Sequence, residues 1–209
     1  MIDLYTFSTP NGRKISIALE EMGLAYQTHV IDITKDEQFA PEFLAISPNN
    51  KIPAIVDREN GMSLFESGVI LKYLADKTGK FMPASGEARW RVEEWLMWQM
   101  AGFGPMLGRA HYFLHYNPGK SEFAEKWFNA EVPRLYGVLD RQLAHSGYMA
   151  GDYSIADMAT FPWVARFANH KANLKDFPRV LEWYEKLSAR PALVKGYGVP
   201  DNDRIPKVS

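Results

Sequence analysis

The chain has 209 residues, of which 46% are apolar and 13% aromatic, enough to fill the core of one large or two modest domains and too many for a disordered chain. Its formal net charge is −1 and neither half is strongly basic, so we expect neither nucleic acid nor an anionic membrane as a partner. Cysteine is absent, so any thiol that takes part in chemistry belongs to a substrate.

The first part of the chain alternates short β-rich runs with helical periodicity. Residues 2–7 predict a strand, and an apolar stripe that begins at Arg13 and stops at Gly23 predicts a helix. Further along we expect a strand over 27–33, a helical turn over 41–46, strands over 54–56 and 62–64, and a helix that begins after Ser67 and ends near Gly79. This order is that of a thioredoxin-like α/β domain, which we place at residues 1–80.

Beyond a link at 81–86 that is rich in small residues and proline, the pattern is helical throughout. Long apolar-rich segments predict helices over 87–104 and 123–143, and a last helix over 178–189 ends before Pro191. The run Ser154-Ile155-Ala156-Asp157 has the Ser-x-x-Asp spacing of a capping box, to which we assign a folding role. We place an all-helical domain at residues 87–209, with an irregular tail beyond Gly196.

The stretch SPNNKIPAIVDRENGMSLFESG, residues 47–68, holds the first chemical clue. Ser67 has the position of a helix N-cap, where a small anion such as an α-carboxylate can bind, and Glu66 beside it can hold an ammonium group. Pro53 is a candidate for a cis peptide bond that turns the amide and carbonyl of Ile52 toward an extended peptide. Lys51 suits a second carboxylate. A short peptide with these groups describes glutathione.

Each of these residues also has an ordinary structural interpretation, as a cap, a solvated charge or a trans proline. Their order along the chain is more specific, since NNKIPAIVD followed by FESG resembles the thioredoxin-like half of the glutathione transferase superfamily. The resemblance implies a glutathione transferase fold, with an α/β thioredoxin-like N-terminal domain followed by an all-α C-terminal domain. It also implies that Pro53 is cis and that Glu66 and Ser67 bind the γ-glutamyl group.

Within that superfamily, the Thr-Pro-Asn-Gly-x-Lys run from Thr9 and the Gly-Pro-Met-Leu-Gly run from Gly104 most resemble the bacterial nu-class disulfide-bond reductases and their fungal regulatory relatives. The resemblance places thiol activation in the loop of Thr9 and Asn11. The Asn11 amide and the Thr9 hydroxyl can each donate a hydrogen bond to sulfur at a helix N-terminus, which favours the thiolate. The alternative is that these residues form only a turn and a cap.

Other candidate site residues are assigned by position. The resemblance places Gln38 against the glycyl end of glutathione. In the helical half, glycines bracket a group that we predict lines the pocket of the second substrate, namely Met106, Arg109, His111 and Tyr112. His111 and His115 have the i, i+4 spacing of metal ligands, but no third ligand stands near in the sequence, so we expect no metal.

The predicted function is that of a glutathione-dependent disulfide-bond reductase, with glutathione as co-substrate and small or mixed disulfides as substrates. The alternatives are a conventional glutathione transferase or peroxidase acting on electrophiles or peroxides, and a non-catalytic glutathione-binding regulatory module. The resemblance implies a homodimer. We expect a cytoplasmic location, because Met1–Tyr5 lacks a signal-peptide pattern and no run approaches the roughly eighteen apolar residues of a membrane span.

Overall fold

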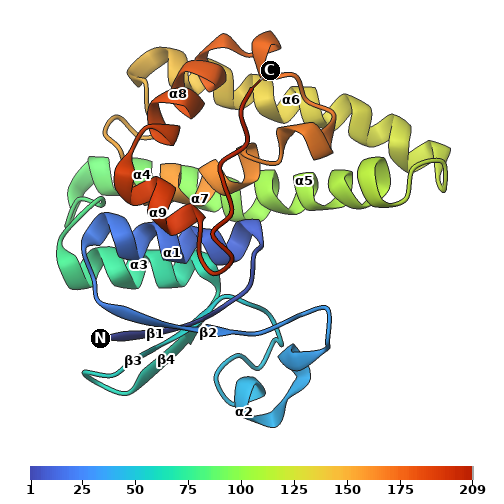
Figure 1. Cartoon of the computed structure of the whole chain (residues 1–209). Coiled ribbons are helices and arrows are strands. Elements are labelled where there is room, and N and C mark those ends of the chain that lie inside the picture. The colour runs from blue at the N-terminus through green and yellow to red at the C-terminus, as the bar shows by residue number, and fades with distance from the viewer. Residues whose placement is uncertain (209) are drawn as a thin grey trace. The chain divides into compact units, whose positions relative to one another are not determined.

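The computed structural model describes residues 1–208, which form two compact units (Figure 1). The first unit contains residues 1–84 and 189–205. The second contains residues 85–188 and residues 206–208. The domain boundaries expected from the sequence, 1–80 and 87–209, remain a prediction. The compact units differ from them mainly because residues 189–205 pack with the first unit.

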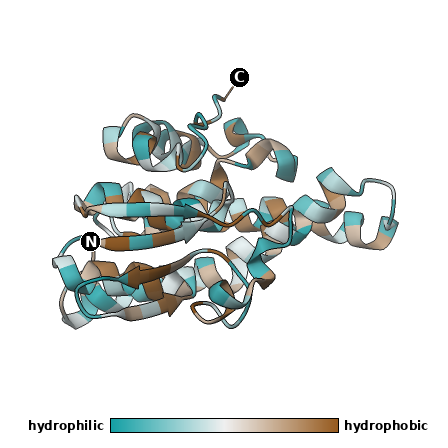
Figure 2. Cartoon of the chain, turned by 60° about the horizontal axis from the view of Figure 1, so that its bottom comes forward, coloured by the Kyte–Doolittle hydropathy of each residue, from teal (hydrophilic) through white to brown (hydrophobic). Residues whose placement is uncertain are grey.

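The first unit is built on a mixed four-stranded sheet in the order β2-β1-β3-β4. Its strands are β1 (Ile2–Thr6), β2 (Tyr26–Val30), β3 (Ala54–Asp57) and β4 (Met62–Phe65). β1 pairs in parallel with β2 and antiparallel with β3, so that Leu4 lies opposite Thr28 and Ile55. Apolar and polar residues alternate along the strand at the N-terminus, as a half-covered sheet requires (Figure 2). The thioredoxin-like fold expected from the sequence is confirmed.

Helices α1 (Pro10–Met22) and α3 (Ser67–Thr78) pack against each other on one face of the sheet (Figure 1), while the short α2 (Pro41–Leu44) follows a 3₁₀ turn at Glu37–Phe39. Nine of the thirteen residues of α1 are buried, including the charged Arg13 and Lys14. α1 ends at Gly23, whose φ of 72° is the left-handed conformation of a helix C-terminus. The predicted stop is therefore confirmed.

The helix α9 (Pro191–Tyr197), which packs on α1 within the first unit, is not predicted from the sequence. Gly196 permits this packing, because a Cβ atom there would lie 2.5 Å from the Cα of Ile17. A helix of seven residues that begins with proline is too short to show a period. Its contacts come from residues about 180 positions earlier, as in the hydrogen bond from Ser16 Oγ to the Gly196 carbonyl (2.7 Å). Local patterns carry no trace of them.

The second unit is helical, as expected. α4 (Gly86–Trp98) continues through a π-helical turn at Gln99–Phe103 into α5 (Gly104–His111) and a second π turn at Tyr112–Tyr116, so the helical run extends beyond the predicted 87–104. The remaining helices are α6 (Glu122–Ser146), α7 (Ile155–Val164) and α8 (Pro178–Ser188), with 3₁₀ turns at Phe167–His170 and Leu174–Asp176. None of the helices within residues 1–208 has the length and apolar character needed to cross a membrane.

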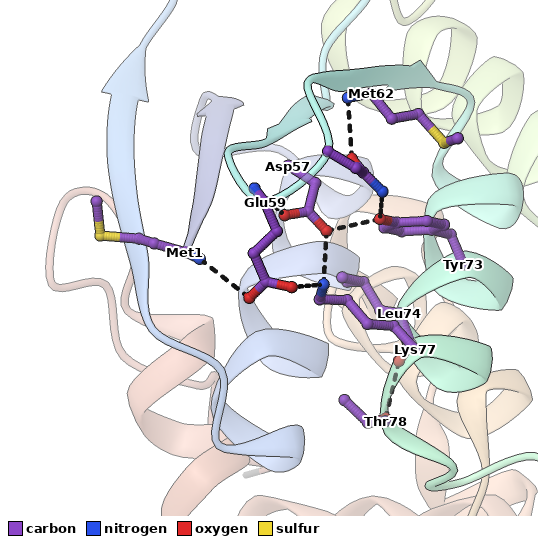
Figure 3. A network of polar contacts seen from close by, with 9 residues as sticks. Met1, Asp57, Glu59, Met62, Tyr73, Leu74, Lys77 and Thr78 are labelled. Carbon is purple, nitrogen blue, oxygen red and sulfur yellow. Dashed lines mark hydrogen bonds and ion pairs between the residues drawn. The ribbon is translucent and has the colours of Figure 1, made fainter.

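A buried carboxylate ties the β3–β4 hairpin to α3 (Figure 3). Asp57 is fully buried and accepts a hydrogen bond from Tyr73 Oη (2.6 Å) and an ion pair from Lys77 Nζ (2.9 Å). Lys77 also pairs with Glu59 in the hairpin turn, and Asn60 donates to Tyr73 Oη. Burial alone would raise the pKa of Asp57, but the hydrogen bonds from Tyr73 and Lys77 hold it at about 2. The network holds the hairpin against the C-terminal half of α3.

Candidate functional site

The start of α1 holds the two residues assigned to thiol activation. Thr9 is the N-cap of the helix, and its Oγ1 accepts a hydrogen bond from the Gly12 amide (3.2 Å). α1 begins at Pro10, three residues before the predicted start, so the half-buried Asn11 lies in its first turn. Thr9 is thus a cap, as the structural alternative stated. Capping uses one lone pair of the hydroxyl and leaves it able to donate a hydrogen bond.

Gly12 lets α1 start directly against the end of β1. A Cβ atom at this position would lie 2.4 Å from both Thr6 Oγ1 and the Phe7 carbonyl oxygen. Any side chain there would displace the loop from the strand. The glycine of the Thr-Pro-Asn-Gly run therefore allows Thr9 and Asn11 to lie close to the C-terminal end of β1.

The C-terminal tail is anchored to the same loop. Ser8 Oγ donates to Asp201, and the buried Arg13 forms an ion pair with Asp203. The guanidinium of Arg13 also lies 4.2 Å from the centre of the Tyr197 ring, a cation–π contact. From the sequence this tail is expected to be irregular, and no role is predicted for it. The only sequence signal for these contacts is that the tail carries acidic residues, Asp201 and Asp203.

The start of α3 brings together the second set of predicted residues. The Ile52–Pro53 peptide bond is cis, as the resemblance implied, and Pro53 is buried directly before β3. Ser67 was predicted as the N-cap, and this is wrong by one residue: Glu66 occupies the cap position with φ of 68°, and Ser67 is the first helical residue. Ser67 is 4% exposed, and its Oγ accepts a hydrogen bond from Lys14 Nζ (3.4 Å), which draws the side chain inward.

Lys14 is a residue of this region that is not predicted from the sequence. It lies on α1 and only 1% of it is exposed. Burial lowers its pKa to about 7, against the opposing influence of the Glu66 carboxylate. A signal was present in the sequence, because Lys14 precedes Ala18 and Met22 at four-residue spacing and so shares the apolar face of α1.

Gln38 and Lys51 lie in the segment between β2 and β3. Gln38 Nε2 donates to Asp36 Oδ1 (3.4 Å), whereas its buried Oε1 has no hydrogen-bond partner among residues 1–208. Lys51 is exposed, and its carbonyl accepts a hydrogen bond from Ser47 Oγ (2.8 Å). Gln38 thus presents an unsatisfied acceptor, and Lys51 presents a solvated charge.

The four residues predicted for the second-substrate pocket do not share one face of their helical run. Met106 and Arg109 lie three residues apart on α5, half-buried and exposed, and Tyr112 is 55% exposed. His111 is only 7% exposed, and its Nε2 lies 2.5 Å from Asn169 Nδ2. Burial, with a smaller contribution from His115, lowers the pKa of His111 to about 4. His111 is thus a neutral, packed residue.

No group of three or more histidine, cysteine, aspartate or glutamate side chains within residues 1–208 is arranged to hold a metal ion. The i, i+4 pair of His111 and His115 has ring centroids 5.3 Å apart. His111 packs instead against Tyr116, with parallel rings 4.9 Å apart.

A thioredoxin-like unit with a cis-proline before β3, followed by an all-helical unit, defines the architecture of a glutathione transferase. Family models for the glutathione S-transferase N-terminal and C-terminal domains match residues 2–76 and 107–197. Disulfide-bond oxidoreductase YfcG of Escherichia coli K12 is 47% identical over 198 residues, which cover 92% of each chain. The chain therefore belongs to the glutathione S-transferase family of enzymes.

Solved structures of relatives match the whole fold. A glutathione transferase from Burkholderia graminis with two glutathione molecules bound per subunit is 42% identical, with a TM-score of 0.91, covering 97% of this chain and 89% of its own. A glutathione transferase from Pseudomonas putida with one glutathione disulfide bound per subunit is also 42% identical. Its TM-score is 0.87, and the match covers 95% of this chain and 91% of the relative.

Proposed function

We propose that this protein is a glutathione-dependent disulfide-bond oxidoreductase of the nu class. The similarity to YfcG carries the proposal, because it extends over 92% of both chains at 47% identity and that relative is named for this activity. The composition agrees, since a chain without cysteine cannot use its own thiol and must take one from a co-substrate.

Glutathione binding is assigned to the first unit. The first turn of α3 supplies backbone N–H groups and the Ser67 hydroxyl for the γ-glutamyl carboxylate, while Glu66 attracts the ammonium group. The backbone of Ile52, beside the cis Pro53, pairs with the peptide, and Lys51 attracts the terminal carboxylate. Gln38 offers its unsatisfied Oε1 to a peptide N–H at the glycyl end.

Thiol activation is assigned to Asn11 and Thr9. Both lie at the N-terminus of α1, where the helix dipole favours negative charge, and each can donate a hydrogen bond to sulfur. Donors that prefer the charged form lower the pKa of a thiol. The thiolate is the species that attacks a disulfide.

The reaction uses two glutathione molecules for each disulfide. The first glutathione thiolate attacks one sulfur of the substrate, forms a mixed disulfide, and releases the other sulfur as a thiolate that takes up a proton. A second thiolate attacks the glutathionyl sulfur, which yields glutathione disulfide and the second product thiol. Relatives with two glutathiones or one glutathione disulfide per subunit are consistent with this stoichiometry.

The substrate pocket and the assembly complete the proposal. Met106, Arg109 and Tyr112 are assigned to the second substrate, with His111 packed behind them as support. We assign a homodimer, since Trp90 and Trp127 are 67% and 47% exposed, and large exposed aromatic side chains are typical of interfaces. The location assigned is the cytoplasm.

The test is turnover of 2-hydroxyethyl disulfide with glutathione, coupled to glutathione reductase and NADPH. We expect rapid turnover that Asn11→Ala reduces and that the control Asn129→Ala, at an exposed position of α6, leaves unchanged. Fast conjugation of an aryl halide without disulfide turnover would instead identify a conventional transferase. Glutathione binding without disulfide reduction, peroxide reduction or conjugation would identify a regulatory module.

The dimer is tested separately by sedimentation. A mass that stays near the 23.8 kDa of one chain across micromolar concentrations would exclude it.

A further inference from the structure

Lys14 places a positive charge inside the first unit, directly behind the start of α3. Its side chain is 1% exposed, and its Nζ lies 3.4 Å from the Oγ of Ser67, which is itself 4% exposed. The hydrogen bond connects the side chain of a residue on α1 to the first residue of α3. A buried ammonium is strongly disfavoured unless an anion lies near it.

Several charged groups lie on the two helices that carry Lys14 and Ser67. Glu66 is the carboxylate that acts on Lys14, and its own side chain is exposed, so water screens its charge. The other charged residues of α1 have partners elsewhere: Arg13 pairs with Asp203, Glu20 with Lys195, and Glu21 with Arg190. On α3, Lys77 pairs with Asp57 and Glu59.

We propose that Lys14 is a positioning residue for glutathione, which acts through Ser67 to stabilise the α-carboxylate of the γ-glutamyl group at the start of α3. The inference rests on the proposed glutathione site and adds a residue to it. A Lys14 N–H directed at Ser67 Oγ polarises the serine hydroxyl, which then donates a stronger hydrogen bond to the ligand. The ammonium and the helix dipole act on the carboxylate in the same direction.

This arrangement couples ligand binding to a proton. Burial lowers the pKa of Lys14 to about 7 in the free protein, so a substantial fraction of Lys14 is neutral at physiological pH. A carboxylate bound nearby favours the charged form and raises that pKa. The complex therefore takes up a proton between the two pKa values, and the affinity falls as the pH rises through them.

Calorimetry with S-methylglutathione tests the proposal, because this ligand has no thiol to titrate. For the wild-type protein we expect uptake of about half a proton at pH 7.5, obtained from binding enthalpies in phosphate and Tris buffers, if the pKa rises by about one unit. The affinity should then weaken roughly three- to tenfold between pH 6.5 and 8.5. The ammonium of the ligand titrates equally in every variant and cancels in their comparison.

Lys14→Met removes the charge and keeps the approximate volume. We expect it to bind S-methylglutathione about tenfold more weakly at pH 6.5, without proton uptake, since a hydrogen bond to a charged group is worth about a factor of ten or more. Lys195→Met, on α9, is the matched control, because that lysine is exposed and paired with Glu20. It should behave as the wild type in both measurements.

The outcomes separate the inference from the proposed function. Binding by the wild type without proton uptake would overturn the role of Lys14 and leave the glutathione site standing, as would a Lys14→Met variant with wild-type affinity and uptake. No binding by the wild type at any pH would overturn the glutathione site itself. Should Lys14→Met fail to fold, the wild-type proton uptake still decides the question.

Discussion

Two helices of this protein begin with a serine beside a carboxylate, yet their first turns differ. At the start of α7, Ser154 Oγ accepts from the Ala156 amide (3.3 Å), and the Asp157 carboxylate accepts from the Ser154 amide (3.0 Å). Asp157 also accepts from the Met149 amide and from Trp183 Nε1. At the start of α3, the cap residue Glu66 makes no side-chain capping bond among residues 1–208, and Lys14 lies behind Ser67.

We propose that the difference separates a folding role at α7 from a binding role at α3. α7 carries its own anion, Asp157, which is fully buried and accepts hydrogen bonds from Ser154, Met149 and Trp183. This helix start therefore has no need of a ligand. The start of α3 instead combines a helix N-terminus with a buried cation, Lys14, and both favour a negative charge nearby. In this proposal similar sequence signals serve different roles, and the residue packed behind the serine decides between them.

The largest expected effect is loss of stability on removal of the internal anion of α7. Asp157→Ala deletes the acceptor for four donors and leaves the buried Trp183 and Met149 N–H groups unsatisfied. We expect a loss of about 3–5 kcal/mol in the free energy of unfolding, measured by urea titration. Asp157→Asn keeps the shape and should lose less. A loss below about 1 kcal/mol for Asp157→Ala would show that the network is not structural.

The pH dependence of stability is the next effect in size. Burial raises the pKa of Asp157 to about 6, although its hydrogen bonds oppose the shift, and the value in the unfolded chain is near 4. The folded state therefore holds the proton more tightly, so this contribution is complete below about pH 4 and is lost as the pH rises through 6. It amounts to about 3 kcal/mol. The slope of the free energy of unfolding against pH, between pH 4 and 6, should be smaller in Asp157→Asn than in the wild type. Equal slopes would contradict the assignment of this pH dependence to Asp157.

The third test measures turnover by a variant at the start of α1. It compares this helix start, which is proposed to bind sulfur, with the start of α3, which is proposed to bind a carboxylate. If Asn11 donates to the thiolate, Asn11→Ala loses about 1.5–3 kcal/mol and the rate falls roughly ten- to a hundredfold. The pKa of the bound thiol should rise, as observed in the ultraviolet absorbance of the thiolate. An unchanged rate and thiol pKa would transfer the role to Thr9 or Ser8.

Features that depend on neighbouring residues could be predicted from the sequence, and features that depend on distant residues could not. The strands, α1, α3 and the Ser154–Asp157 capping box depend on periodicity and caps, and they were predicted to within a few residues. Family resemblance added the cis bond before Pro53, which residue chemistry alone disfavours. The position of Lys14 behind Ser67 and the packing of α9 on α1 join segments that are distant in sequence. The spacing of Lys14 with Ala18 and Met22 indicates burial, but no local pattern predicts that Ser67 is its partner or that α9 packs on α1.

The same reason explains the error at Ser67. Its sequence context resembles that of Ser154, which is an N-cap, but the backbone of Glu66 has a positive φ and takes the cap position instead.

The smallest expected effect compares the two serines directly. Ser154→Ala removes a true N-cap and should lower the free energy of unfolding by about 1 kcal/mol, while binding of S-methylglutathione stays unchanged. Ser67→Ala leaves the cap residue Glu66 in place and removes the Oγ that accepts a hydrogen bond from Lys14, so its main effect should be on ligand binding. Its affinity for the ligand should fall about tenfold, since the serine donates to a charged carboxylate in the proposed complex.

That carboxylate has the same charge before and after reaction, so turnover at saturating glutathione should change little in Ser67→Ala. Urea titration, calorimetry and saturation kinetics on the two variants give the three quantities. Equal losses of stability in both serine variants, with no change in affinity at Ser67, would make α3 a second capped helix of the α7 kind and remove the contrast between them.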